Sequence, residues 1–223
     1  MMELPYKEVP FSIDGHDLVL KTIKGNEDFR HPIFMISGVR TANDVMRGEE
    51  TQLTGCLHSD DEEDQIFIFP GTHSKHVKVN NGRAVDFATY MTGEFFELLS
   101  QKSILSNNVE ADNNLLSTNL KSFETGVTDS SDSHILHTAF LVRTNQLFGK
   151  FSKPENYNYL SGLLIGTELQ QLIKKDIPLT LVSSKKLEQS YSAALSILGL
   201  KFKVQNSEEA LIRGQYRILE YNK

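Results

Sequence analysis

The sequence predicts an α/β protein in which helices cover a sheet. Three strand patterns come first in the chain, a hairpin pattern follows the third, and the second half alternates between helical and strand patterns. This order is typical of a sheet that packs against helices. The chain has no low-complexity segment and no repeat of solenoid period, so we expect an ordinary globular fold.

Short apolar runs bounded by polar residues or glycine predict the strands. These runs are residues 17–22, Ile33–Ile36, Gln65–Phe69, Leu179–Val182 and Lys201–Val204. A β-hairpin is expected after the third run, with Val77–Val79 and Ala84–Tyr90 as its strands. Asn81 and Gly82 stand between them, and an Asn-Gly pair adopts the positive φ angles of a tight hairpin turn at low cost.

Apolar residues at helical spacing predict the helices. The expected helices are residues 44–55, Thr92–Ser100, Ser131–Phe148, Asn156–Ile173, Leu187–Leu198 and Ser207–Leu219. Val45, Met46 and Leu53 indicate the first of them, and Gly55 can end it. The acidic run at residues 59–64 is expected to form a solvated loop.

Composition excludes several classes of protein. The net charge of −6 argues against broad, non-specific nucleic-acid binding, which needs a basic surface, but it leaves room for a small anion. The single cysteine, Cys56, rules out an intramolecular disulfide and a thiolate zinc cluster. No signal peptide and no apolar run of membrane-spanning length is evident, so we expect a cytoplasmic protein without membrane partners.

The segment Phe69–Lys75, Phe-Pro-Gly-Thr-His-Ser-Lys, is the strongest candidate for a binding site. It follows a buried-strand pattern and opens the hairpin. Gly71 allows close approach of a ligand, Thr72 and Ser74 offer hydroxyl groups, and consecutive backbone N–H groups can form an anion-binding nest. Lys75 adds a positive charge. These are the parts of a phosphate cradle, although an ordinary polar turn has the same composition.

Several ordered blocks of the sequence resemble 2-keto-3-deoxygalactonate kinases (2-dehydro-3-deoxygalactonokinases). The blocks are residues 44–53, 69–75, 81–83, 87–94, 98–105, 159–169 and 181–184, followed by Tyr191, Ala194 and Leu195. The resemblance runs from about Pro5 to the C-terminus. One departure is His76, where the family usually carries Trp, and this departure affects a stacking or packing contact rather than the loop.

The resemblance implies an actin-like sugar-kinase fold, with two ribonuclease-H-like domains and the ligands in the cleft between them. Residues 1–63 would be a remnant of the N-terminal, substrate-side domain, and residues 64–223 the complete C-terminal ATP-binding domain. Gly71 to Lys75 would be the second phosphate hairpin, and residues 162–167 and 183–184 would lie near the nucleoside. ATP and Mg²⁺ are the implied cofactors, and the implied reaction phosphorylates the 6-hydroxyl of 2-keto-3-deoxygalactonate.

The family's first phosphate loop, of the type Asp-X-Gly-Thr-Ser, has no counterpart in this sequence. Phosphoryl transfer depends on positioning by both walls of a cleft. We therefore expect the isolated chain to transfer phosphate poorly, either as a nucleotide- or sugar-acid-binding fragment or as a partner of a second chain that supplies the loop. A shortened N-terminal sheet would also leave an exposed edge through which a homodimer could form.

A sugar kinase also needs a carboxylate that accepts the proton of the attacking hydroxyl. In related sugar kinases it follows a glycine at the start of a helix, and Glu49 and Glu50 after Gly48 occupy a similar place. We favour Glu49, although two glutamates in a first helical turn also stabilise the helix dipole. Arg47 suits either a substrate carboxylate or a structural ion pair.

Other candidate residues also have a structural alternative. His73 contacts a phosphate or caps the turn, and Thr92 is expected to be the N-cap of the following helix. Gly162 and Gly166, four residues apart, permit either close packing of helices or approach to the adenine. Ser183, at the end of a predicted strand, is expected near the nucleoside by resemblance.

Overall fold

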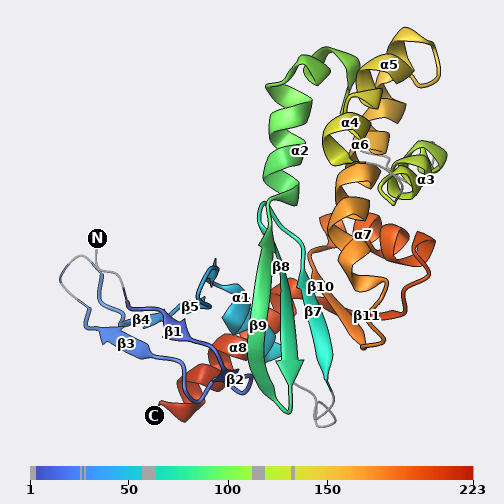
Figure 1. Ribbon diagram of the computed structural model, residues 1–223. Helices are drawn as coiled ribbons and strands as arrows, with labels where there is room; N and C mark the ends of the chain where they lie inside the picture. The colour runs from blue at the N-terminus through green and yellow to red at the C-terminus, as the bar shows by residue number, and fades with distance from the viewer. Residues whose placement is uncertain are drawn as a thin grey trace.

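The fold is built around one six-stranded sheet in the order β11-β10-β7-β8-β9-β2 (Figure 1). The computed structural model describes residues 4–25, 27, 29–56, 64–111, 119–131 and 134–222. The strands are β2 (Phe11–Ser12), β7 (Gln65–Phe69), β8 (Ser74–Asn80), β9 (Arg83–Tyr90), β10 (Leu179–Ser183) and β11 (Phe202–Asn206). β10 runs parallel to β7 and β11, whereas the other neighbours pair antiparallel.

Two small sheets lie in the N-terminal part of the chain. One consists of β1 (Lys7–Glu8), β5 (Val39–Arg40) and β6 (Val45–Met46), and the other of β3 (Leu20–Ile23) and β4 (Ile33–Ile36). Figure 1 shows these strands, in blue, projecting to one side of the main sheet.

Helices cover both faces of the main sheet. α1 (Glu49–Gly55) and α8 (Ser207–Tyr221) pack on one face, and α3 (Leu120–Asp129), α6 (Lys153–Leu169) and α7 (Lys185–Ile197) pack on the other. The remaining helical segments are α2 (Thr92–Gln101), η1 (Ile104–Asn108), α4 (Ile135–Thr138), α5 (Leu141–Leu147) and η2 (Gln170–Leu172). α2 rises from the end of β9, and with α4, α5 and the start of α6 it stands above the sheet (Figure 1).

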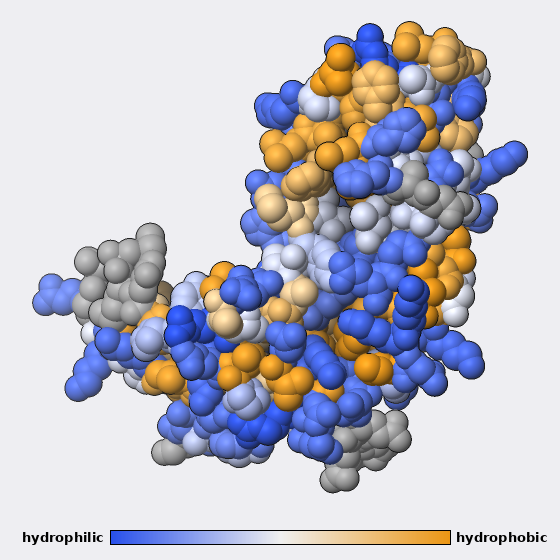
Figure 2. All heavy atoms as spheres, in the orientation of Figure 1, coloured by the Kyte–Doolittle hydropathy of each residue, from blue (hydrophilic) through white to orange (hydrophobic). Residues whose placement is uncertain are grey.

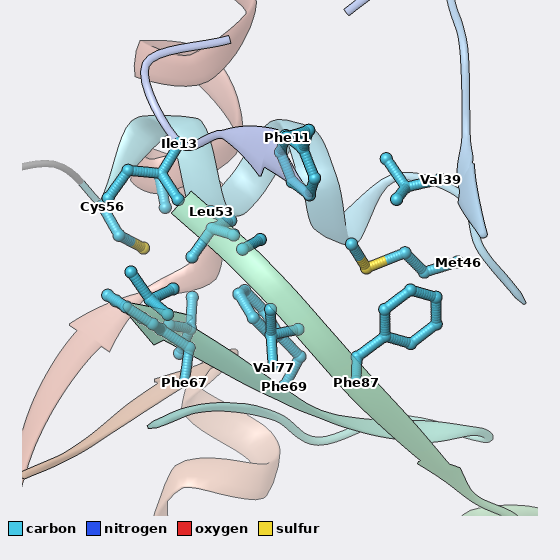
Figure 3. Close-up of a cluster of buried hydrophobic side chains, with 14 of the residues drawn as sticks. Phe11, Ile13, Val39, Met46, Leu53, Cys56, Phe67, Phe69, Val77 and Phe87 are labelled. Carbon is cyan, nitrogen blue, oxygen red and sulfur yellow. The ribbon is translucent and has the colours of Figure 1, made fainter. Parts of the chain in front are cut away.

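The central strand β7 contributes to the core on both faces. All five of its residues are buried. Phe67 and Phe69 lie in the cluster that includes α1 and α8 (Figure 3), whereas Ile66 and Ile68 lie in the cluster formed with α3, α6 and α7. Because successive side chains of a strand point to opposite faces, a strand between two helical layers needs a continuous apolar run.

Glycines bring two pairs of helices into backbone contact. A Cβ added at Gly214 of α8 would lie 1.8 Å from the carbonyl oxygen of Thr51 in α1. One added at Gly162 of α6 would lie 2.2 Å from the carbonyl oxygen of Phe123 in α3. No side chain fits at such distances, so the absence of a Cβ lets α1 approach α8, and α3 approach α6.

The predicted α/β class and most of the strands are confirmed. Ile33–Ile36 and Gln65–Phe69 are strands with the predicted bounds. The hairpin turn has φ angles of 47° at Asn81 and 68° at Gly82, as an Asn-Gly turn between twisted strands requires. The prediction that Gly55 ends the first helix is also confirmed.

The beginning of that first helix was predicted wrongly. Val45 and Met46 lie in β6, and α1 begins only at Glu49. Gly48 separates the two elements with a φ of 113°, which a side chain rarely permits. The apolar spacing therefore belongs to one strand and one short helix rather than to a single helix.

Three further predictions need correction or fall outside the description. Thr92 is not the N-cap of α2, because Met91 occupies that position and the Thr92 hydroxyl donates to Glu168 instead. The helical stretch 131–148 contains two short helices, α4 and α5. Most of the predicted acidic loop, residues 59–63, lies outside the described residues.

Candidate functional site

The loop between β7 and β8 is braced against the first turn of α2. The backbone N–H of Glu94 donates to the carbonyl of Thr72 at 3.0 Å, and His73 Nε2 lies 2.5 Å from Glu94 Oε2. A Cβ at Gly93 would lie 2.6 Å from the carbonyl oxygen of Gly71, so the lack of a side chain at Gly93 allows this contact. The His73 side chain thus pairs with the Glu94 carboxylate rather than capping the backbone of the turn, and its contact with a phosphate stays a prediction.

The strand that follows the loop sends successive side chains to opposite faces of the sheet. Ser74 is buried, and its Oγ lies 2.8 Å from the hydroxyl of Tyr191 in α7. Lys75 is also buried but approaches α1, where its Nζ lies 3.6 Å from Glu49 Oε1 and donates to the carbonyl of His73 at 3.0 Å. The β7–β8 loop therefore borders both helical layers.

The two candidate carboxylates differ in accessibility. The Glu49 side chain is 23% exposed and faces Lys75, while one of its oxygens accepts the backbone N–H of Arg47 at 3.1 Å. Glu50 is only 2% exposed and accepts hydrogen bonds from the Gly48 N–H at 2.7 Å and the Thr51 hydroxyl at 3.0 Å. Burial raises the pKa of the Glu50 carboxyl to about 7. Of the two carboxylates, that of Glu49 is therefore the more accessible.

Arg47 precedes the acidic pair at the junction of β6 and α1. Its guanidinium lies over the ring of Tyr6, 4.8 Å from the ring centroid. A cation over an aromatic face is attracted by the ring quadrupole. Tyr6 thus helps to position the Arg47 side chain, and the backbone N–H of Arg47 donates to Glu49.

A cavity of about 670 Å³ lies between α2, α6 and the first turns of α7. Gly71 stands at its border, and its own Cβ position is open, with the nearest atoms 4.0 Å away in His73. Apolar lining comes from Phe96, Leu164, Ile165 and Leu187, and polar lining from Ser161, Lys185, Lys186 and Gln189. We call it the α2–α7 cavity. Its volume lies within the usual range for small-molecule sites.

The structure does not bring every predicted residue to this cavity. Gly162 and Gly166 face α3, where added Cβ atoms would lie 2.2 Å from Phe123 O and 2.5 Å from Ser130 Oγ, so their packing role is the one observed. Ser183 is buried at the end of β10 and donates to the carbonyl of Ser184. The cavity is lined instead by neighbours of these residues on α6 and α7.

The role of Glu168 was not predicted from the sequence. This α6 residue is buried and accepts hydrogen bonds from His76, Thr92 and Tyr191. His76, the one departure noted in the hairpin, fills its place by pairing with this carboxylate and by lying 4.5 Å from the ring centroid of Tyr90. A glutamate in an otherwise apolar helical stretch was the available signal, because a buried carboxylate requires partners.

The described residues contain no group of three or more His, Cys, Asp or Glu side chains that could hold a metal ion. Nor does any helix in the described part of the chain combine the length and the apolar character needed to cross a bilayer.

Comparison with protein families gives one family match that spans nearly the whole chain. The family described as 2-keto-3-deoxy-galactonokinase matches residues 1–218. A crystal structure of a protein from Sinorhizobium meliloti, assigned as a 2-dehydro-3-deoxygalactonokinase, superposes with a TM-score of 0.83 at 31% identity. That superposition covers 96% of this chain and 73% of the other.

Two curated relatives carry the same activity in their names. A protein of Rhizobium meliloti (strain 1021), named as a probable 2-dehydro-3-deoxygalactonokinase, is 33% identical over 192 residues, which cover 84% of this chain and 59% of the relative. The 2-dehydro-3-deoxygalactonokinase of Escherichia coli (strain K12) is 30% identical over 202 residues, 87% of this chain and 65% of the relative. The chain thus spans about three-fifths of the length of these relatives.

Proposed function

This chain belongs to the 2-keto-3-deoxy-galactonokinase family, and on that premise we propose that it is a sugar-acid kinase. The reaction would use ATP to phosphorylate the 6-hydroxyl of 2-keto-3-deoxygalactonate. The observation that carries this proposal is the position of the β7–β8 loop. One side of the loop borders a cavity of nucleotide size, and the other side contacts the accessible carboxylate of Glu49.

The proposal includes the actin-like architecture and its division into two parts. Residues 1–63 would belong to the substrate-side domain and residues 64–223 to the ATP-binding domain. The mixed sheet, with antiparallel β7, β8 and β9 next to parallel β10 and β11, supports this assignment. β2 and α1 would then connect the two parts, because β2 pairs with β9 and Leu53 of α1 lies in one core cluster with Phe67 and Val77.

ATP would bind in the α2–α7 cavity with its base near the apolar side chains and its phosphates at the β7–β8 loop. Among the described residues, none accepts a hydrogen bond from the backbone N–H groups of Thr72 and His73. Two consecutive N–H groups of this kind can hold phosphate oxygens. Lys185 and Lys186 at the start of α7 add positive charge to the cavity wall. Mg²⁺ would be carried by the phosphates, as is usual in kinases.

Glu49 would accept the proton of the attacking 6-hydroxyl. General-base catalysis requires a carboxylate that is both ionised and accessible. Lys75, whose Nζ lies 3.6 Å from Glu49 Oε1, would hold this carboxylate next to the loop. Arg47, whose fork matches a carboxylate, would bind the acid group of the sugar. Glu50 would support the helix start from within the core.

Nucleotide binding is tested by filling the open space at Gly71. The variant Gly71→Val is expected to keep the melting temperature of the ligand-free protein. The atoms nearest to an added Cβ belong to His73 and lie 4.0 Å away, and Gly71 does not have a positive φ angle. The affinity for Mg-ATP, measured by calorimetric titration, should fall at least about tenfold, because the side chain blocks approach to the loop. Unchanged affinity for Mg-ATP would show that the phosphates do not bind at this loop.

Catalysis is tested with the two glutamates as a matched pair. In a coupled assay with 2-keto-3-deoxygalactonate, Glu49→Gln should lower turnover by about 10²–10⁴-fold without changing the affinity for Mg-ATP. Glu50→Gln should retain most of the turnover. If the unaltered chain binds Mg-ATP but shows no turnover, it is a nucleotide-binding fragment rather than an enzyme by itself. If Glu50→Gln is the inactive variant, the base has been assigned to the wrong residue.

A further inference from the structure

Glu168 lies at the centre of a buried hydrogen-bond network beneath the α2–α7 cavity. Its side chain is 1% exposed. One carboxylate oxygen lies 2.9 Å from His76 Nε2, and the other accepts the hydroxyls of Tyr191, at 2.7 Å, and of Thr92. Burying a carboxylate away from water is energetically costly, and donors such as these offset that cost. The donors come from β8, α2 and α7, so Glu168 joins three elements to α6.

The network continues from Glu168 to the β7–β8 loop with a defined direction. Burial, and then the neighbouring Glu168 carboxylate, raises the pKa of the Tyr191 hydroxyl well above its ordinary value, so this group stays protonated and donates to Glu168. The hydroxyl of Ser74 must then donate to the oxygen of Tyr191, 2.8 Å away. The Ser74 oxygen in turn accepts the backbone N–H of Gly71 at 3.4 Å.

This direction decides which groups of the loop remain available for a ligand. The hydroxyl proton of Ser74 and the N–H of Gly71 are used within the network. The N–H groups of Thr72 and His73 are not used by any described residue. The network therefore holds the start and the end of the loop and leaves the two middle N–H groups for an anion.

We propose that Glu168 is a positioning residue for the β7–β8 loop, and that it acts through Tyr191 and Ser74 to hold the loop in its phosphate-binding conformation. The proposal rests on the proposed function, because it assumes that the polyphosphate of a nucleotide binds at this loop. Glu168 itself contacts neither the base nor the phosphates. Its loss should therefore weaken binding through the phosphates and leave binding of the base unchanged.

The test compares ATP with adenosine, which carries the same base and ribose but no phosphate. Glu168→Gln keeps the shape of the side chain and replaces one acceptor oxygen by an amide donor. The dissociation constant for Mg-ATP is expected to rise about tenfold, the value of roughly one hydrogen bond to a charged group. The dissociation constant for adenosine, measured by protein-observed NMR, should change less than about twofold. Tyr191→Phe removes the link to Ser74 and should give the same difference between the two ligands.

Tyr159→Phe provides the matched control for a loss of buried hydrogen bonding. Tyr159 also lies on α6, is fully buried, and donates its hydroxyl to Asp129 Oδ2 at 2.8 Å, but its partner lies in α3. This variant should lower the melting temperature without changing the ratio of the two dissociation constants. Equal weakening of ATP and adenosine by Glu168→Gln and Tyr191→Phe would make Glu168 merely structural and overturn the inference.

The test also separates this inference from the proposed function. If the unaltered protein binds ATP no more tightly than adenosine, its phosphates gain nothing from the loop, and the proposed nucleotide site is wrong. If the unaltered protein binds ATP much more tightly but the two variants do so as well, the proposed site stands. In that case the positioning role of Glu168 is rejected.

Discussion

Glu50 and Glu168 are two buried carboxylates on opposite faces of the same sheet, and they are stabilised in opposite ways. Glu50 accepts from Gly48 and Thr51, which lie within two residues of it in the chain. The donors to Glu168 lie 23, 76 and 92 residues away. Local partners shape one helix start, whereas distant partners fasten several elements together. Burial alone therefore does not tell which kind of task a carboxylate performs.

Truncation of each carboxylate should give the largest difference between the two regions. Glu168→Ala leaves three donors from three elements without their acceptor, and we expect the free energy of unfolding to fall by about 3–5 kcal/mol. Glu50→Ala should cost about 1–2 kcal/mol, because its donors belong to one helix end that water can reach after a small local change. Urea denaturation measures both, and equal losses would abolish the distinction.

The pH dependence of stability should reveal the raised pKa of Glu50. Its pKa is about 7 in the folded protein, against an ordinary value of 4.5, so between these two pH values the folded protein retains a proton that the unfolded chain releases. Below pH 4.5 the contribution of Glu50 to the free energy of unfolding does not change with pH. As the pH rises from 4.5 through 7, the free energy of unfolding falls by about 3 kcal/mol in all. The difference between the unaltered protein and Glu50→Gln, followed by urea denaturation from pH 4.5 to 8, isolates this contribution. A flat difference would contradict the raised pKa.

Two threonine variants should give the smallest difference between the regions of Glu50 and Glu168. Thr51→Val and Thr92→Val each remove one hydroxyl donor from one of the carboxylates. We expect Thr92→Val to cost about 1–2 kcal/mol and to weaken ATP binding, since it loosens α2 from α6. Thr51→Val should cost less than about 1 kcal/mol at pH 7 and leave ATP binding unchanged. Thermal melts and ATP titrations of the pair would decide whether local and distant donors differ.

Parts of the fold that depend on neighbouring residues could be predicted from the sequence. The apolar run of β7 and the Asn81-Gly82 turn carry their structure in a few consecutive residues, and both predictions are confirmed. The join between β6 and α1 was missed because Val45 and Met46 also match helical spacing, and only the φ of Gly48 separates the two elements. Spacing cannot report a backbone angle that a single glycine permits.

The loop of the candidate site could be predicted from the sequence, but the contacts that hold the loop in place could not. The residues from Gly71 to Lys75 carry recognisable donors, and their roles as phosphate ligands stay a prediction. The Glu168 network could not be predicted, because α6 is buried on most of its surface and therefore shows no apolar stripe that would indicate which face meets which partner. Its partners are brought together only by the tertiary fold.

The contact of α1 with α8 also sets an order of events during synthesis. Arg213 Nε donates to the carbonyl of Gly55 at 3.1 Å, and Arg217 Nη1 donates to the carbonyl of Thr54 at 2.7 Å. The two partners are 158 positions apart in the first pair and 163 in the second. These arginines satisfy carbonyls at the end of α1 that the helix itself cannot. On the ribosome, the last turn of α1 is capped only after Arg213 and Arg217 have been synthesised. The start of the helix that carries Glu49 can thus be ordered by neighbouring residues, whereas its end depends on contacts made much later.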